Sequence, residues 1–224
     1  MGQTLILKKK QREYGEVNTY VFELSGPFTF RAGQFCHLYM PGMPIFSRWV
    51  RKISFASCPS DKYIVFTIKE SPSKLWHQKL KALEPGDKIR ILGSHAHGHM
   101  SFPESIKQPV ICIAGGMGAT PFRSLFRDEI NNKSNRNISF IHVASNEYLY
   151  EEEFSNYPIS RYTIRRKDIE KTLSEIVSKY PNGAYLLAGN AEFVRAIAKN
   201  LVSLNVCADD IQAHKLKKHR LKKN

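Results

Sequence analysis

PVICIAGGMGATPF, residues 109–122, predicts a β-strand, a glycine turn and the start of a helix, in that order. Residues 110–113 form a short apolar run with β-branched side chains, which is typical of a buried strand. The glycines that follow tolerate positive φ and leave no Cβ between the backbone and a ligand. A helix that begins near Thr120 presents unpaired N–H groups and a positive dipole end, which suit a phosphate. The spacing differs from the G-x-G-x-x-G fingerprint of dinucleotide sites, so a tight strand-to-helix turn without a ligand is the alternative.

Beyond this stretch, strand-like and helical patterns alternate. Strands are expected at residues 110–113, 138–143, 161–164, 184–187 and 210–214, and helices at 120–131, 149–154, 168–179 and 191–204. Such alternation predicts a parallel sheet, which binds ligands at the carboxyl ends of its strands.

The first hundred residues predict a different architecture, built from short strands separated by turns. These strands are expected at residues 4–8, 17–24, 34–40, 49–57, 62–69 and 87–92. Six short strands at such intervals indicate an antiparallel barrel. Apolar residues at helical spacing predict one helix over residues 73–83, with Ser73 as its N-cap. We expect a linker at residues 101–108, between a first domain of residues 1–101 and a second of residues 109–224.

Composition limits the class of protein. The chain has 224 residues, with 34 Lys and Arg against 20 Asp and Glu, which gives a formal net charge of +14. This charge favours anionic partners such as nucleotides or an acidic protein, and we do not expect nucleic acid binding. No apolar run approaches the ~20 residues of a transmembrane helix, and the N-terminal apolar patch is too short for a signal peptide. Four scattered cysteines predict free thiols in a reducing cytoplasm and no iron–sulfur cluster.

Six short motifs resemble, in order, those of the ferredoxin–NADP reductase superfamily. They are RAGQF at residues 31–35, RKISFAS at 51–57, LEPGD at 83–87, GSHAHG at 93–98, GGMGATPF at 115–122 and LAGN at 187–190. The resemblance covers about residues 34–211, nearly the whole chain. It implies a six-stranded antiparallel Greek-key β-barrel that binds flavin, followed by an α/β Rossmann-like domain with a parallel sheet that binds NAD(P).

The resemblance implies flavin contacts from the segment Arg51, Lys52, Ile53 and Ser54. By its position, Arg51 matches an arginine that holds flavin phosphate in the family. The chemistry agrees, because a guanidinium pairs with phosphate through two hydrogen bonds. Ser54 matches the serine beside flavin N5, and it is the one residue given a catalytic role. Ile53 replaces the tyrosine that stacks on the flavin ring; the electron-transfer subunits of dihydroorotate dehydrogenase are similar in having Ile there. The alternative is that Arg51 is a surface residue of an ordinary strand.

Further flavin contacts are implied in the next strand and at the start of the helix after it. They are Thr67, Ile68 and Lys69, beside the ribityl and adenine-side groups, and Ser73 and Lys74, beside the diphosphate. A diphosphate implies FAD rather than FMN. Two alternatives stay open: Ser73 only caps the helix, or Ser71 takes its place.

In the second domain the resemblance implies a site for a nicotinamide nucleotide. Its residues are Gly115, Gly116, Gly118, Thr120 and Pro121 at the pyrophosphate, Ser145 and Asn146 at a ribose, and Gly189, Asn190 and Phe193 beside the nicotinamide. Ala188 stands where the family has a cysteine that contacts the ring, which predicts slower hydride transfer. Glu147 would repel a 2′-phosphate and therefore favours NADH over NADPH. Arg161, Arg165 and Arg166 lie one strand later and leave NADPH as the alternative.

Three alternating histidines, His95, His97 and His99, have the chemistry of zinc or copper ligands. On an extended strand they would share one face. No carboxylate or cysteine lies nearby in the sequence, and we therefore assign no metal and interpret them as polar loop residues.

Together these features predict an NAD(P)H-dependent FAD oxidoreductase, in which hydride passes from nicotinamide C4 to flavin N5. The electrons would then leave to a separate acceptor: a free flavin, a ferric chelate, a quinone or an acidic redox protein. The basic tail at residues 215–224 suits an acidic partner, and a solvated chain end is the alternative. The competing function is a basic binding or electron-transfer accessory protein with the same fold and no NAD(P)H activity, which Ile53 and Ala188 favour.

Overall fold

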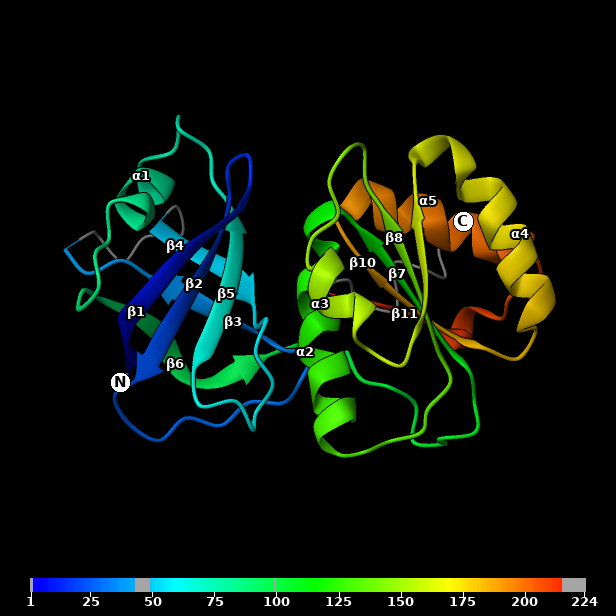
Figure 1. The fold of residues 1–224 in the computed structure, drawn as a ribbon, viewed down its shortest axis with the longest axis horizontal. Helices are drawn as coiled ribbons and strands as arrows, with labels where there is room; N and C mark the ends of the chain where they lie inside the picture. Colours follow the sequence, from blue (N-terminus) through cyan, green and yellow to red (C-terminus); the bar gives the residue numbers. More distant parts are fainter. Residues whose placement is uncertain (1, 43–48, 99, 215–224) are drawn as a thin grey trace. The chain divides into compact units, whose positions relative to one another are not determined.

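The structure, a computed structural model, describes residues 2–42, 49–98 and 100–214. The chain divides into two compact units, Met1–His99 and Met100–Asn224, and each has its own sheet (Figure 1). The basic tail at residues 215–224 and His99 lie outside the described residues. None of the helices in the described ranges has the length and apolarity of a transmembrane span. The four cysteines lie within the described residues, and no disulfide joins them.

The first unit is a six-stranded antiparallel sheet with one helix. Its elements are β1 (Gln3–Tyr14), β2 (Val17–Leu24), β3 (Phe35–Tyr39), β4 (Val50–Ser54), β5 (Ile64–Lys69), α1 (Leu75–Lys81) and β6 (Lys88–His97). The strands pair in the order β4-β3-β6-β1-β2-β5. Just after β4, the Ala56 N–H donates to the Val65 carbonyl of β5 at 2.8 Å, although no ladder joins β4 to β5 among the described residues. The predicted antiparallel barrel is confirmed, as a barrel-like sheet that is not closed.

The core of this unit lies between the sheet and α1. Tyr20 and Phe22 alternate along β2 and face the core, because side chains two apart on a strand share a face. Trp76 and Leu80 of α1 are buried in the same core, and four residues separate them, so they lie on one side of the helix. Seven residues are too few for a stable isolated helix. Burial of each such side chain stabilises the fold by roughly 1.5–3 kcal/mol, and this packing therefore holds α1 in place.

The second unit is a five-stranded parallel sheet with helices on both faces. Its strands are β7 (Val110–Gly115), β8 (Ile138–Val143), β9 (Ser160–Ile164), β10 (Ala184–Ala188) and β11 (Ile211–Ala213), in the order β11-β10-β7-β8-β9. The helices are α2 (Ala119–Asn131), α3 (Glu151–Ser155), α4 (Ile169–Lys179) and α5 (Ala191–Ser203), with short 3₁₀ turns η2 (Gly116–Gly118), η3 (Arg166–Asp168) and η4 (Ala208–Asp210). The predicted parallel sheet is confirmed.

Neighbouring residues of the central strands face opposite helical layers. Phe140 of β8 contacts Phe126 of α2 and Phe154 of α3. Ile141, the next residue, belongs to the core that α4 and α5 cover. Figure 1 shows α2 and α3 on one side of this sheet and α4 and α5 on the other. A parallel sheet covered in this way needs strands that are apolar on both faces, which explains the continuous apolar runs of the sequence.

Three local predictions are corrected by the structure. Ser73 does not cap α1: the N-cap is Lys74, without a side-chain cap bond, and the Ser73 hydroxyl lies 3.1 Å from the Ser71 hydroxyl instead. Strand β1 continues to Tyr14 rather than ending at residue 8, because its second half pairs with β2. Residues 93–97 are not a loop: they are the last part of β6, where Phe35 of β3 pairs with His97.

Candidate functional site

The glycine turn of the second unit lies at the carboxyl end of β7, the central strand of the parallel sheet. Strand β7 ends at Gly115, the turn η2 covers the next three residues, and α2 begins at Ala119. Neighbouring strands β10 and β8 flank β7, so their carboxyl ends lie beside the turn. This is the edge at which parallel α/β sheets bind their ligands.

The three glycines of the turn are required for different reasons. Gly116 has a φ of +50°, and a Cβ placed on it would meet nothing within 4 Å. On Gly118 a Cβ would lie 2.1 Å from the carbonyl oxygen of Ala188, and on Gly115 it would lie 2.7 Å from the ring of Phe193. Packing within the protein therefore explains Gly115 and Gly118, whereas only Gly116 keeps an open face that a ligand can approach.

Thr120 supplies a polar group that the protein leaves unsatisfied at the start of α2. Its side chain is 4% exposed, and its Oγ1 has no hydrogen-bond partner. The N-cap of α2 is Gly118, which has no side chain to cap the helix. A buried hydroxyl without a partner costs free energy, and a phosphate oxygen is a suitable acceptor for it. The open Gly116 face and the Thr120 hydroxyl therefore fit a dinucleotide phosphate. Pro121, also expected at this site, is buried and has no backbone N–H to donate.

His142 of β8 also belongs to this site, and the sequence reasoning missed it. The imidazole is 1% exposed, and its Nε2 lies 3.0 Å from the Gly116 carbonyl oxygen. Burial lowers the pKa of His142 to about 4, although the hydrogen bond to Gly116 acts in the opposite direction. The ring is therefore neutral at pH 7. The signal was present in the sequence, since a histidine is the one strongly polar side chain in the run ISFIHV.

The segment after β10 meets the turn from the other side. Gly189 and Phe193 are close, because a Cβ on Gly189 would lie 2.7 Å from the Phe193 ring. Phe193 is 7% exposed, so its ring is a packing surface under Gly115 and Gly189. Asn190 caps α5: its Oδ1 accepts the N–H of Phe193 at 2.8 Å. The structure thus brings these three predicted residues next to the glycine turn, with the amide oxygen of Asn190 already engaged.

The carboxyl ends of β8 and β9 lie side by side, since the Ala144 N–H donates to the Ile164 carbonyl at 3.1 Å. The exposed side chains that follow are Ser145, Asn146 and Glu147 after β8, and Arg165 and Arg166 after β9. Arg161 is placed differently, because its guanidinium donates to the Glu151 carbonyl of α3 at 2.9 Å. The ends of β8 and β9 near Ser145 and Asn146 therefore carry both a negative side chain, Glu147, and positive ones, Arg165 and Arg166.

In the first unit, β4 and α1 bring together the residues expected at a flavin phosphate. The Arg51 guanidinium lies 5.8 Å from the centre of the Trp76 ring of α1. Burial lowers the pKa of His77, and the positive charges of Lys74 and Arg51 lower it further. Arg51 and Lys74 thus contribute to one positive region beside α1, which fits a diphosphate. Arg51 itself is partly buried.

The other predicted flavin contacts differ in what their side chains can offer. Ser54 is buried, and Lys52 is exposed on the same face of β4. Ile53, on the other face, is partly buried against the hydrophobic core. On β5, the Thr67 hydroxyl lies 2.6 Å from the Thr19 hydroxyl, and Lys69 is exposed. Ile68 is buried in the core, and it pairs with Asn18 of β2.

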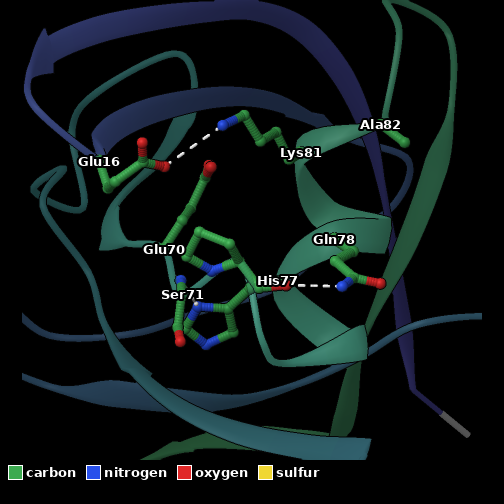
Figure 2. Close-up of a pocket in the computed structure, with 8 residues that line it drawn as sticks. Glu16, Glu70, Ser71, His77, Gln78, Lys81 and Ala82 are labelled. Carbon is green, nitrogen blue, oxygen red and sulfur yellow. Dashed lines mark hydrogen bonds and ion pairs between the residues drawn. The ribbon is translucent and has the colours of Figure 1, made fainter.

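A pocket of about 290 Å³ lies beside α1 (Figure 2). Ser71 and His77 line it, and the Ser71 N–H donates to His77 Nδ1 at 2.8 Å. Glu16 and Lys81 form an ion pair of 3.2 Å at the same pocket. Ser73 and Lys74 do not line this pocket, whereas Ser71, the alternative to Ser73, does.

The histidine motif is part of β6 and contacts β3. The rings of His37 and His97 have centroids 4.6 Å apart, and burial, His97 and Lys52 lower the pKa of His37. Among the residues whose side chains the structure describes, no group of three or more His, Cys, Asp or Glu is placed to hold a metal ion. His99 is outside the described residues, and so is the side chain of His95.

Comparisons with known proteins find partial likeness to flavohemoproteins and to a monooxygenase reductase component. No family model matches the chain. It is 24% identical over 186 residues to a flavohemoprotein of Oceanobacillus iheyensis, which covers 72% of this chain and 45% of the relative. It is 31% identical over 121 residues to the reductase component of propane 2-monooxygenase of Mycolicibacterium goodii, which covers 53% of this chain and 33% of the relative. The chain thus spans less than half the length of these curated relatives.

Solved structures share the fold over nearly the whole chain. A ferredoxin reductase in carbazole 1,9a-dioxygenase matches with a TM-score of 0.79 at 17% identity, covering 96% of this chain and 69% of that one. A ferredoxin NADP+ reductase from Neisseria gonorrhoeae with bound FAD and NADP matches with a TM-score of 0.78 at 14% identity. The match covers 94% of this chain and 96% of that one. At such identities the likeness shows a common fold.

Proposed function

We propose that this chain, which has the ferredoxin–NADP reductase fold, is an NAD(P)H-dependent FAD oxidoreductase that passes electrons to a separate acceptor. The observation that carries the proposal is the open Gly116 face beside the unsatisfied hydroxyl of Thr120, at the carboxyl end of the central strand. The likeness to reductase components and flavohemoproteins supports it.

The chain's own residues have defined tasks in this proposal. In the second unit, the Gly116 turn and Thr120 bind the pyrophosphate of the nucleotide, Ser145 and Asn146 hold a ribose, and the segment that begins at Gly189 borders the nicotinamide. In the first unit, Arg51 and Lys74 neutralise the FAD diphosphate. The Ser54 hydroxyl hydrogen-bonds flavin N5.

When bound, a flavin accepts two electrons as hydride from a nicotinamide and returns electrons to other acceptors. The protein's contribution is then orientation and charge, because hydride transfer needs no general acid or base. For this chain we propose a small molecule or an acidic redox protein as the acceptor. Its basic character supports the second, through faster encounter with acidic surfaces.

The first test is the visible spectrum of the purified protein. We expect flavin absorbance that bleaches when NADH is added without oxygen. Arg51→Ala should lower FAD content, and Lys62→Ala, a change to an exposed lysine in the loop before β5, should not. A protein that takes up no flavin even after incubation with FAD would instead favour the non-enzymatic accessory protein that Ile53 and Ala188 suggest.

The second test concerns the coenzyme. We propose a preference for NADH, because exposed Glu147 follows Ser145 and Asn146 and would repel a 2′-phosphate. Arg165 and Arg166 after β9 favour the opposite outcome. Steady-state kcat/KM for NADH and NADPH decides between them, and a tenfold preference for NADPH would show that the arginines dominate. In that event Arg165→Ala and Arg166→Ala should reduce the preference, and Lys167→Ala is the matched control.

A further inference from the structure

We infer that His142 is a positioning residue: it holds the Gly116 carbonyl and so keeps the glycine turn in the conformation that receives the nucleotide's phosphates. The inference rests on the proposed function for the identity of the ligand. Its geometric part, the hydrogen bond from a buried histidine to the turn, does not depend on that function.

The register of the sheet explains how the side chain reaches the turn. His142 pairs with Ala114 of β7, one residue before that strand ends at Gly115. The imidazole therefore reaches past the end of the neighbouring strand, to the first residue of η2. A shorter side chain at this position would not reach the carbonyl, and an aliphatic one could not donate to it.

The chemistry of the contact defines the state of the imidazole. A carbonyl oxygen only accepts hydrogen bonds, so His142 Nε2 must carry the proton. The ring packs against Tyr148 and Phe140, with centroids 5.4 Å and 5.6 Å away, which fixes its orientation. His142 is thus a neutral donor in a defined tautomer, buried where water cannot replace it.

The direction of the Gly116 carbonyl matters for an anion. This oxygen accepts from both His142 and the Ala119 N–H at the start of α2, which uses both of its lone pairs. Its peptide bond is trans, as are all described peptide bonds, so the N–H of Met117 points away from the carbonyl and from His142. Without His142 the Ala119 N–H alone would hold this carbonyl, and any rotation of the peptide would present its oxygen to the phosphate, which repels it.

The test compares two substitutions of His142 in the full-length holoprotein. His142→Phe keeps an aromatic ring and removes the donor, whereas His142→Gln retains a donor. We expect His142→Phe to raise the dissociation constant of NAD+, measured by calorimetry, and the KM for NADH roughly fivefold, the value of one buried hydrogen bond. The FAD content and kcat should be nearly unchanged. His142→Gln should restore the affinity to within about twofold of wild type.

Ile141→Val is the matched control, because Ile141 is the buried neighbour on the same strand and faces the other helical layer. It should lower stability without changing nucleotide affinity. If His142→Phe folds, retains FAD and binds NAD+ as wild type does, the positioning role is wrong while the proposed function stands. If wild type itself binds neither NAD+ nor NADH, the proposed function is wrong.

An independent readout uses nitrogen chemical shifts of the histidine rings, which distinguish the two neutral tautomers and the imidazolium. We expect the Nε2–H tautomer for His142 at pH 7, in the presence and absence of nucleotide. An Nδ1–H tautomer, or titration near the ordinary pKa of a histidine, would overturn the hydrogen bond on which the inference depends. This measurement uses the wild-type protein, so it decides the matter even if His142→Phe fails to fold.

Discussion

At the scale of single residues, the glycine turn combines positions that are filled by the protein with one that is open. The Cβ position of Gly118 is occupied by the Ala188 backbone, and that of Gly115 by the Phe193 ring. Gly116 instead has a positive φ and free space. Substitution at these glycines should therefore produce different defects.

We predict that Gly118→Ala destabilises the fold and that Gly116→Ala weakens nucleotide binding. A Cβ at 118 meets backbone atoms that cannot move aside, and we expect a loss of about 3 kcal/mol in the free energy of unfolding. At 116 the cost is the positive φ, about 1 kcal/mol, together with a methyl group on the ligand's side. Urea denaturation and the KM for NADH separate the two effects.

Gly15→Ala is the control, because Gly15 has a φ of +47°, no atom within 4 Å of its Cβ position, and lies in the other unit. It should cost as much stability as Gly116→Ala and leave the KM unchanged. Equal KM values for the wild type and Gly116→Ala would show that the ligand does not approach this glycine.

The buried His142 also predicts a pH dependence of stability. Its pKa is about 4 in the folded protein against an ordinary 6.5, so the unfolded chain binds the proton more tightly. The neutral His142 therefore contributes fully to the free energy of unfolding above pH 6.5, and this contribution is lost as the pH falls toward 4. Between pH 8 and pH 5 it amounts to about 2 kcal/mol.

Denaturation of wild type and His142→Phe at several pH values isolates this effect, because the carboxylates are common to both. The groups that contact the imidazole are the Tyr148 and Phe140 rings and the Gly116 carbonyl, so no carboxylate or cation is among them. From pH 8 to pH 5 the wild type should lose about 2 kcal/mol of its free energy of unfolding relative to His142→Phe. A constant difference would mean that His142 titrates equally in both states.

At the scale of elements, a buried polar pair joins β2 to the residue that follows β5. The Tyr20 hydroxyl donates to Glu70 Oε1, and Glu70 is 4% exposed with Oε2 unpartnered. Burial, together with Glu70, raises the pKa of the Tyr20 hydroxyl. The Glu70 N–H also donates to the Glu16 carbonyl at 2.8 Å, which ties this point to the β1–β2 hairpin.

We predict that Tyr20→Phe destabilises the first unit by about 2 kcal/mol, because it leaves a buried carboxyl group without its donor. Tyr20→Phe combined with Glu70→Leu should recover part of that loss, since both polar groups are then removed. The free energy of unfolding in urea measures both. Glu70→Leu alone completes the cycle, and a double variant that loses as much stability as the two single variants together would show that the pair does not interact.

At the scale of the whole molecule, the net charge of +14 is the property that bears on partners. Part of it lies in residues 215–224, outside the described residues. Charge of this density accelerates encounter with acidic proteins, and the effect falls as salt screens it.

We predict that deletion of residues 215–224 leaves NADH oxidation with a small neutral acceptor nearly unchanged. Reduction of an acidic redox protein should become slower and less sensitive to salt. Stopped-flow rates at low and high ionic strength provide the measurement, and replacing the tail's basic residues with Gln at constant length is the control. Unchanged rates and salt dependence would show that the tail does not dock a partner, and loss of FAD would show that it belongs to the fold.

Most of the element order follows from the sequence, because strand and helix periods are local. The run from Val110 predicted a buried strand, a glycine turn and a helix, and the alternation after it predicted a parallel sheet; both are found. Likewise, residues 17–24 and 138–143 were predicted as strands with the bounds that the structure has. The local pattern is sufficient for these features, because the period of a strand or helix determines on which of its faces each side chain lies.

Contacts between distant segments are what only the tertiary structure decided. Sequence spacing assigned all three glycines to phosphate binding. In the structure, Gly115 and Gly118 instead make room for Phe193 and Ala188, which are about 70 residues away in the chain. His142 could be recognised as part of the turn only when parallel pairing placed β8 beside β7. The length of β1 and the strand state of His97 likewise depend on pairing partners. The physical reason is that pairing register and close packing are set by what lies across the sheet, which no local period records.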